Sequence, residues 1–505
     1  MSAAPFITRK SFLWSAAATL ALLALALALA LALLVERLEI APRSLGPYLE
    51  RRAEGHNPLI AGFGSWAGRT LVALDRGDQL PFALPALTLG AQPVPAATVN
   101  AAIPQAVQAR QVVFVDSAAA ARTAIQAARP GNVITFLPGS YHFSDRTIVA
   151  SQPGSSAMPI TVRAQQPGTV TLLFGLSEGF KVSAPYWVFE NLTIQGVCRQ
   201  HGDCEHAFHV VSQASHFIAR NNVITDFNAH FKINGEGNIY PDHGVIEANT
   251  LSNASVRQTA NPVTPIDLVG ASDWRIRGNL ISDFIKGEGN RVSYGAFAKG
   301  AGSGNRFERN IILCERALRG APGQRVGLSL GGGGTGSDYC RDRRCLTEHD
   351  GGSIDGNLIA SCSDDGIYLN RASASKVAHN TLLDTAGITV RFAVSSADIE
   401  GNLVDGLIRS RDDGVVRAVD NLTGAMAASY LGWHTARALY RQPATLDLAW
   451  RTAPPRRDAG KTQASDLCGR NRPAQPVYGA FEDFADCLGF PGAARTIAPL
   501  AVGMR

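Results

Sequence analysis

Two patterns of hydrophobic and polar positions divide the chain. Between Lys10 and Glu36 lies an uncharged run, Ser11–Val35, made mostly of Leu and Ala and free of Gly and Pro. Beyond Val112, apolar residues alternate with polar ones in short stretches bounded by Gly, Asn or Ser, which is typical of strands. We therefore expect one long apolar helix followed by a body built of short β-strands.

The apolar run is long enough to cross a membrane. At 1.5 Å per residue, Ser11–Val35 spans a hydrocarbon core of about 30 Å. A cleavable signal peptide has an apolar stretch of about 7–15 residues, so the length favours an uncleaved anchor, although Ala-x-Ala pairs leave cleavage open. Arg9 and Lys10 before the run favour a cytoplasmic N-terminus. We expect a cytoplasmic tip at 1–10, an anchor or signal at 11–35, and the remainder in the periplasm of a bacterial-type inner membrane, or secreted after cleavage.

One phrase recurs through the middle of the chain: an apolar residue, two variable ones, Asn, then two residues of which the second is apolar. Its asparagines follow one another at intervals of 22 to 47 residues, which indicates a solenoid. Because a second short strand precedes most copies, we predict an all-β parallel β-helix over 111–424, with the asparagine amides stacked as a ladder. The copies are Ile246–Leu251, Ile276–Ile281, Phe307–Ile312, Ile354–Ile359, Val377–Leu382 and Ile399–Val404, with a loose copy at Val188–Ile194 and a degenerate one at Asn222.

The flanking segments lack this repeat. Residues 36–110 are rich in Ala and Pro and indicate a spacer with short helices, and 425–505 are expected to form a C-terminal cap or to return along the solenoid, because open sheet edges need covering. Eight cysteines suit an oxidising compartment. Their spacing favours three local disulfides and leaves Cys314 and Cys362, each just after a copy of the phrase; buried free thiols are the alternative. The local pairs are Cys198 with Cys204, Cys340 with Cys345, and Cys468 with Cys487.

Composition and net charge indicate which kinds of partner this protein is expected to bind. Hydrophobic residues make up 46% and charged residues 18%, and the net charge of +5 is spread over 505 residues. A nucleic-acid-binding protein concentrates basic residues on one face, so we expect no nucleic acid partner. The 50 Gly and 26 Pro argue against a helical bundle. We expect a monomer.

Three stretches resemble the start of family 6 polysaccharide lyases, the alginate lyase and chondroitinase B type: Ala124–Tyr141, Pro159–Gly168 and Val182–Leu192. The resemblance covers 112–424 at the level of fold. It implies a right-handed parallel β-helix of the pectin lyase type, export, and action on an acidic polysaccharide. In that family a Lys removes the proton next to the sugar carboxylate, an Arg aids the leaving oxygen, and calcium neutralises the acid.

The active-site motif of the family is matched only in part. Lys299, in Ala298–Asn305, stands at the place of the family's lysine. The two Glu calcium ligands would precede it by seven and five residues, where this chain has Val292 and Tyr294. The family's Arg falls in Leu328–Gly334, where this chain has four glycines in a row. Calcium is therefore not supported by the sequence, the cofactor stays open, and we predict no metal site.

The remaining site candidates come from the strand pattern. Lys299 is our candidate base, and Arg391, or an Arg of the loop closed by Cys340 and Cys345, is the candidate for neutralising charge. A solvated surface lysine, an ordinary polar ladder and a decorated turn are the plain alternatives. The expected substrate-binding residues are Lys232, Asp267 and Tyr368 on stacked strands, and Arg341, Arg343 and Arg344 in the loop.

These features predict a lyase-like protein that acts on an acidic polysaccharide by proton abstraction and β-elimination. A non-catalytic glycan-binding or cell-envelope β-helix is the first alternative. An inverting glycoside hydrolase or uronate epimerase is the second, because Asp364–Asp365 resembles the paired aspartates of pectin-hydrolysing β-helices, although Asp-Asp-Gly is also common turn chemistry.

Overall fold

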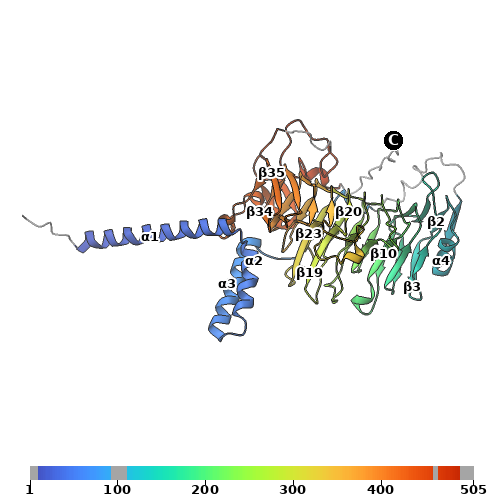
Figure 1. Ribbon diagram of the computed structural model, residues 1–505, viewed down its shortest axis with the longest axis horizontal. Coiled ribbons are helices and arrows are strands. Elements are labelled where there is room, and N and C mark those ends of the chain that lie inside the picture. The colour runs from blue at the N-terminus through green and yellow to red at the C-terminus, as the bar shows by residue number, and fades with distance from the viewer. Residues whose placement is uncertain (1–8, 93–110, 459–464, 490–505) are drawn as a thin grey trace, which may run out of the picture. The chain divides into compact units, whose positions relative to one another are not determined.

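The computed structural model describes residues 9–92, 111–458 and 465–489 (Figure 1). The chain divides into two compact units. The helical unit comprises Met1–Gly77 with Gly424–His434, and the solenoid unit comprises Asp78–Thr423 with Thr435–Arg505.

The solenoid unit is a parallel β-helix, as the sequence predicts. Each coil contributes one strand to each of three long parallel sheets, so strands pair with those of the preceding and following coils (Figure 1). The 12-stranded sheet is formed by β1 (Val112–Val115), β2 (Val133–Phe136), β5 (Ile160–Ala164), β8 (Trp187–Glu190), β11 (Ile218–Arg220), β14 (Val245–Glu247), β17 (Arg275–Arg277), β21 (Arg306–Glu308), β25 (Ser353–Asp355), β29 (Ser375–Ala378), β32 (Ser396–Glu400) and β35 (Val415–Val419).

Two further sheets complete the coils. The 11-stranded sheet is formed by β3 (Gly139–Phe143), β6 (Val170–Phe174), β9 (Thr193–Gly196), β12 (Val223–Thr225), β15 (Thr250–Ser252), β18 (Leu280–Ser282), β22 (Ile311–Leu313), β26 (Leu358–Ala360), β30 (Thr381–Leu383), β33 (Leu403–Val404) and β36 (Leu422–Thr423). The 10-stranded sheet is formed by β4 (Ile148–Ala150), β7 (Glu178–Val182), β10 (His206–Val211), β13 (Ala229–Asn234), β16 (Ile266–Val269), β19 (Val292–Lys299), β23 (Gln324–Leu330), β27 (Ile367–Asn370), β31 (Gly387–Arg391) and β34 (Leu407–Arg411).

Like residues stack inside the coils. Because parallel pairing without register shift repeats each inward position on the next coil, Phe180, Phe208 and Phe231 lie one above another, with ring centroids 5.1 and 5.2 Å apart. All three are fully buried. The alternation of apolar and polar residues thus decides which face of each strand is the core and which is left for other contacts.

The predicted asparagine ladder is present. The side-chain carbonyl of Asn310 accepts hydrogen bonds from the backbone and side-chain N–H groups of Asn279, each at 3.0 Å, and Asn357 accepts from Asn310 in the same way at 2.9 Å. The residue before each ladder asparagine has a positive φ, for example Arg309 with 51°. The left-handed turn is therefore made one place before the ladder asparagine. The ladder consists of Asn222, Asn249, Asn279, Asn310, Asn357, Asn380, Asn402 and Asn421.

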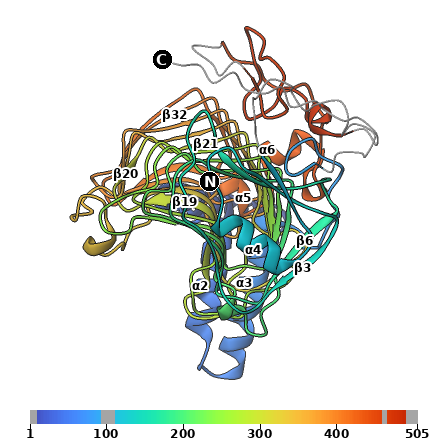
Figure 2. The ribbon, with the colours of Figure 1, turned by 90° about the vertical axis from the view of Figure 1, so that its right-hand side faces the viewer.

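Other segments of the solenoid unit cover its exposed surfaces. Helix α4 (Ala118–Gln126), capped by the Ser117 hydroxyl, lies across the first coils, as the view along the coils in Figure 2 shows. Outward apolar residues of the 11-stranded sheet pack against parts of 78–92 and 435–489. The smaller elements are α6 (Thr435–Ala438), the antiparallel pair β37 (Tyr440–Gln442) and β38 (Asp447–Trp450), the parallel strands β20 (Gly302–Ser303), β24 (His349–Asp350) and β28 (Ala372–Ser373), and the 3-10 turns η2 (His201–Asp203), η3 (Ser337–Tyr339), η4 (Pro443–Thr445) and η5 (Phe484–Cys487).

All eight cysteines form disulfides. The three local pairs that spacing predicts are confirmed. The fourth disulfide joins Cys314 to Cys362, which follow β22 and β26 on successive coils. Stacking brings these two residues together although 48 positions separate them in the chain.

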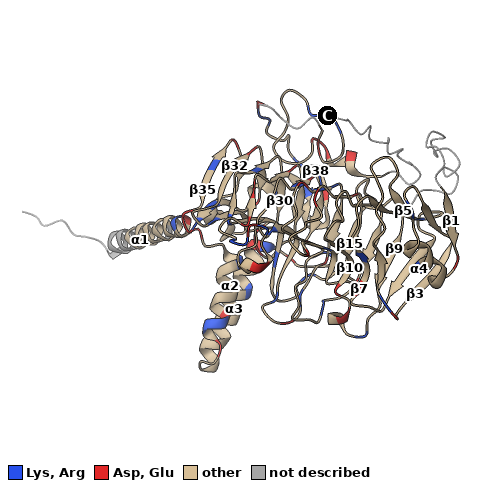
Figure 3. Cartoon of the chain, turned by 45° about the vertical axis from the view of Figure 1, so that its right-hand side comes forward, with Lys and Arg blue, Asp and Glu red and all other residues tan. Residues whose placement is uncertain are grey.

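The helical unit begins with α1 (Arg9–Leu38), whose stretch Ala18–Leu38 is long and apolar enough to cross a membrane, with mean hydropathy 2.8 (Figure 3). Helices α2 (Pro42–Ala53) and α3 (Pro58–Arg76) pack as a hairpin. A buried ion pair between Arg43 and Asp75, 2.6 Å from Nη2 to Oδ1, joins the start of α2 to the end of α3. The short helix α5 (Met426–Ser429) also belongs to this unit.

Candidate functional site

Two rows of side chains line the outward face of the 10-stranded sheet. Successive strands place the members of each row in register, so neighbours along a row are about 4.8 Å apart at the backbone. The first row reads Lys181, His209, Lys232, Asp267, Phe297, Ser329, Tyr368, Thr389 and Arg409, and the second, two residues further along each strand, includes Val269, Lys299, Asn370, Arg391 and Arg411.

Lys299 lies near the middle of this face, at the end of β19. Its Nζ lies 4.4 Å from the centroid of the Phe297 ring, and Phe297 contacts Tyr294 edge to face with centroids 5.6 Å apart. Nζ makes no hydrogen bond or ion pair with a residue that the structure describes. Burial lowers the pKa of Lys299, and the charge of Asp267 opposes that effect while that of Lys232 adds to it. This amine is therefore easier to deprotonate than an ordinary lysine.

A glycine loop covers Lys299 on one side. A side chain at Gly332 would lie 2.6 Å from Lys299 Cδ, and one at Gly333 would lie 2.5 Å from Asn370 Nδ2, so only glycine fits between these residues. The backbone N–H groups of 332–334 donate to no acceptor in the described residues. The end of the loop is held where the buried carboxylate of Glu348 accepts from the Thr335 hydroxyl at 2.8 Å.

Beyond the loop, a second polar cluster surrounds the Tyr368 hydroxyl. The Tyr368 hydroxyl accepts a hydrogen bond from Asn370 Nδ2 at 3.1 Å and another from Arg391 Nη1 at 3.3 Å. Arg391 also donates to Asp412 at 2.5 Å, and these two hydrogen bonds raise the pKa of Arg391. Asn370 Oδ1 is buried and has no hydrogen-bond partner within the described ranges. The cluster therefore holds a phenol oxygen next to a fixed positive charge.

Lys232 and Asp267, both predicted as site residues, form an ion pair on adjacent strands, with Nζ 3.0 Å from Oδ2. The other carboxylate oxygen of Asp267 is buried and has no partner among the residues described. Further along the row, His209 lies 2.7 Å from Glu178 and 2.9 Å from Asn234. Ion pairs and hydrogen bonds thus link neighbouring strands along this part of the face.

The basic loop lies beside the site but holds its arginines by internal contacts. Arg341 pairs with Asp242 at 2.7 Å, and its guanidinium lies 4.9 Å from the centroid of the Tyr240 ring. Arg343 donates to the backbone carbonyl of Asp338 and to Asn238, and Arg344 is exposed. The Arg341 backbone N–H donates to Gly300, directly after Lys299, at 2.9 Å. The loop therefore forms a wall next to Lys299; Arg341, Arg343 and Arg344 are all exposed, and the first two are held by these contacts.

The aspartate pair does not have the geometry of two carboxylates that flank a water molecule. Asp365 is buried, pairs with Arg409 at 3.1 Å and accepts from Thr389 at 2.9 Å. Burial and the neighbouring Asp364 raise the pKa of Asp365 to about 7. Asp365 therefore stabilises the turn beneath the row.

The residues near Lys299 do not fit a calcium ion. Calcium is bound by oxygen ligands, chiefly carboxylates. Val292 and Tyr294 occupy the two positions where the resemblance implies acidic ligands, and Tyr294 packs on Phe297. Over the described residues no group of three or more His, Cys, Asp or Glu side chains is arranged to hold a metal.

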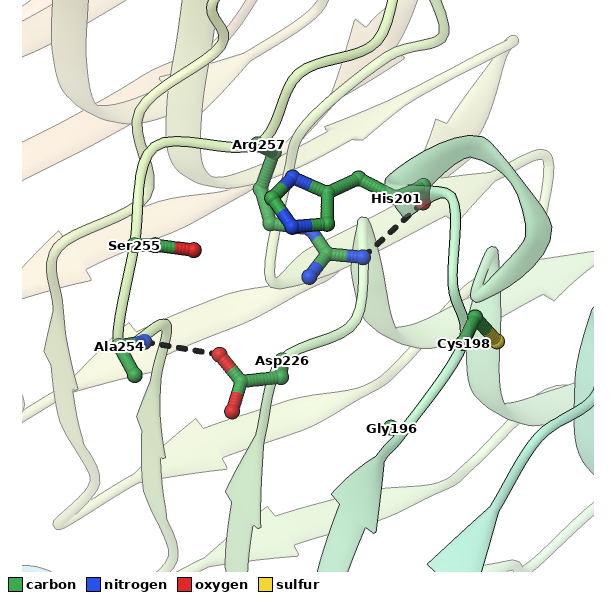
Figure 4. A pocket seen from close by; sticks show the side chains of 7 residues that line it. All are labelled: Gly196, Cys198, His201, Asp226, Ala254, Ser255 and Arg257. Atoms are coloured by element: carbon green, nitrogen blue, oxygen red, sulfur yellow. Dashed lines mark hydrogen bonds between the residues drawn. The ribbon is translucent and has the colours of Figure 1, made fainter.

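A separate pocket of about 210 Å³ opens at the turns that follow the 11-stranded sheet (Figure 4). Its buried arginine, Arg257, donates to the His201 carbonyl and to Asn228 Oδ1, both at 3.0 Å, and Asp226 accepts from the Ala254 N–H at 2.8 Å. Burial lowers the pKa of Arg257 to about 10. These contacts tie successive turns together, away from the two rows of the 10-stranded sheet.

Comparisons with known proteins show similarity in fold to solved structures at low sequence identity. No family model matches the sequence, and a search of curated proteins finds no match. Similar solved structures include the pectate lyase Pel9A (14% identity, TM-score 0.49, 74% of this chain and 97% of that chain) and an alginate lyase from Paenibacillus sp. str. FPU-7 (15%, 0.37, 62% and 96%). A PL6 family polysaccharide lyase from Pseudopedobacter saltans is also similar (14%, 0.35, 68% and 99%).

Proposed function

We propose that this protein is an extracytoplasmic polysaccharide lyase that cleaves an acidic polysaccharide by β-elimination. The single observation that carries the proposal is Lys299: a partly buried amine with lowered pKa and no ion-pair partner within the described chain, on the outward face of the solenoid. A lysine that only stabilised the fold would be paired or fully solvated. An amine that must take a proton from carbon near neutral pH needs this kind of environment.

The arrangement around Lys299 suits the two ends of an elimination. Lys299 and Tyr368 lie on strands two steps apart, with the 331–334 loop beside them, and the sugar ring is proposed to lie over this loop. Lys299 Nζ takes the proton from the ring carbon next to the carboxylate, and that electron pair forms the new carbon–carbon double bond. The bond from the adjacent carbon to the glycosidic oxygen breaks, and the Tyr368 hydroxyl gives its proton to that oxygen.

Negative charge that develops on the substrate carboxylate needs a positive counterpart. The N–H groups of 332–334 donate to no acceptor in the described residues and lie in the loop next to Lys299 and Asn370, and we propose that they donate to the substrate carboxylate. Arg391 donates a hydrogen bond to the Tyr368 hydroxyl and is proposed to hold it in place for proton donation to the leaving oxygen. Lys232, Asp267 and the exposed Arg344 are proposed to contact neighbouring sugar units.

Two features support the proposed extracytoplasmic compartment. Four disulfides indicate folding in an oxidising environment, and Ala18–Leu38 has the length and composition of a membrane anchor. We place the solenoid on the periplasmic side, where it would meet extracellular or envelope polysaccharide.

Purified protein incubated separately with alginate, chondroitin and pectate tests the proposal. A lyase produces an unsaturated sugar that absorbs ultraviolet light, a hydrolase releases reducing ends without that absorbance, and a binding protein changes neither. Lys299→Ala should lower the rate by about 10²–10⁴-fold, whereas Lys376→Ala, at an exposed lysine of the 12-stranded sheet, should leave it unchanged. Full turnover by Lys299→Ala would remove Lys299 from the mechanism.

A further inference from the structure

The helical hairpin has a complete inner face and an uncovered apolar outer face. On the inner side, a side chain at Gly64 would lie 2.2 Å from Ala53 Cβ, and one at Gly68 would lie 2.8 Å from the Gly46 carbonyl, so α2 and α3 approach closely. On the outer side of α3, Leu59, Phe63 and Trp66 are 83%, 66% and 58% exposed. These three residues recur at helical spacing, so they form one stripe along α3.

Such a stripe is unusual on a surface that faces water only. Single exposed apolar residues are common, but a contiguous large apolar surface marks an interaction site. Ile60 widens the stripe near the start of α3, and Arg69 lies at its far end, where the guanidinium would reach a phosphate group. An apolar helix face that combines Trp, Phe and Leu with a basic residue at its edge is typical of helices that lie at a membrane surface.

The short link between α1 and α2 determines which surface the hairpin can reach. Three residues separate the end of α1 at Leu38 from the start of α2 at Pro42, a distance of about 14 Å at full extension. The Tyr430 hydroxyl donates to the Ile40 carbonyl at 2.8 Å, which fixes the segment 424–434 at the same junction. That segment exposes Leu431 and Trp433, and tryptophan is enriched where a membrane meets water.

We infer that the hairpin lies along the outer surface of the phospholipid bilayer that α1 crosses, with the Leu59–Phe63–Trp66 stripe inserted among the lipid headgroups. This inference rests on the proposed anchor and goes beyond it. A single span would hold the chain to the bilayer at one point only, whereas a second, surface-bound element would hold it at two and limit its rotation about the span.

Site-directed fluorescence on the full chain in phospholipid vesicles tests this inference. Because all eight native cysteines are in disulfides, an introduced cysteine is the one free thiol and can carry an environment-sensitive fluorophore. Phe63→Cys should show emission shifted to shorter wavelength and quenching by brominated lipids. Arg51→Cys, on the exposed face of α2 that points away from α3, is the matched control and should show water-like emission without lipid quenching.

Extraction with alkaline carbonate separates failure of the anchor from failure of the hairpin. A chain that is extracted lacks an inserted span, and both proposals fall. A chain that stays inserted while Phe63→Cys shows water-like emission overturns the hairpin inference alone. Shifted emission without lipid quenching, together with crosslinking between copies through the thiol introduced by Phe63→Cys, would mean that a second chain covers the stripe, and this also overturns it.

Discussion

The asparagine ladder allows a stability prediction that can be worked from individual hydrogen bonds. Asn310 is fully buried, and replacing it with alanine removes four of them. Two are accepted from Asn279, at 3.0 Å each, and two are donated, to the Ile276 carbonyl and to Asn357, at 2.9 Å each. At about 1 kcal/mol per bond, the loss is about 4 kcal/mol, and buried groups left unpaired increase it.

The last residue of the ladder is the matched control. Asn421 also makes four side-chain hydrogen bonds, two with Asn402 and one each with the Ile399 and Val419 carbonyls, at 2.8 to 3.1 Å. It is only partly buried, so water can replace those bonds when the side chain is removed. We expect Asn421→Ala to lower the free energy of unfolding by about 1 kcal/mol.

Urea unfolding monitored by circular dichroism, combined with hydrogen exchange of the affected coils, measures both effects. Exchange is needed because a solenoid can open coil by coil, in which case a single transition midpoint does not report the local loss. Faster exchange should appear in the coils of Asn279 and Asn357 when Asn310 is replaced. The reasoning is refuted if the free energy of unfolding of Asn310→Ala lies within about 1 kcal/mol of that of the original protein, or if Asn421→Ala is equally destabilising.

The other predictions concern the site. Gly333→Ala should lower kcat/KM by about 10²-fold, since its side chain would meet Asn370 and its φ of +56° disfavours any other residue, whereas Gly336→Ala, with 3.5 Å of space to Tyr339, should match the original enzyme. Asp267→Asn should move the rising limb of the pH–rate profile to lower pH, because Asp267 favours the charged form of Lys299 and its removal lowers that pKa further; a shift to higher pH would contradict this electrostatic assignment. Treatment with EDTA should leave the rate unchanged, and loss of activity restored by calcium would show a metal site.

Period-two patterning explains why the solenoid and most of the row were predictable. Once the register is known, the alternation along each strand places Lys232, Asp267 and Tyr368 on the same outward face as Phe297 and Lys299. The turn conformation was not predictable in the same way. Asparagine tolerates a positive φ, but the ladder requires its amide between coils, so the preceding residue takes the strained conformation.

Two features of the structure depend on tertiary contacts that local sequence patterns do not indicate. The segment 36–110 is predicted to be a spacer because it is rich in Ala and Pro. Yet Pro42 and Pro58 lie in first turns, where proline is tolerated, and at Gly64 and Gly68 the two helices approach closely. Likewise, a basic loop next to Lys299 suggests substrate contacts, but Asp242 comes from a different coil and pairs with Arg341. Neither the close contact between α2 and α3 nor the ion pair between Asp242 and Arg341 produces a periodic pattern in the sequence.

Two departures from the lyase motif bear on the site of Lys299, one on its own strand and one in the loop after the next strand. Val292 and Tyr294 stand where the resemblance implies acidic ligands. The ring of Tyr294 packs on Phe297, whose ring in turn lies against the Lys299 amine. In the proposed mechanism, a site without acidic ligands must neutralise the substrate carboxylate by other means, and the glycines at 332–334 offer backbone N–H groups that donate to no acceptor in the described residues. The proposed metal-independent elimination requires both differences together, since neither the base nor the carboxylate partner would be available from one of them alone.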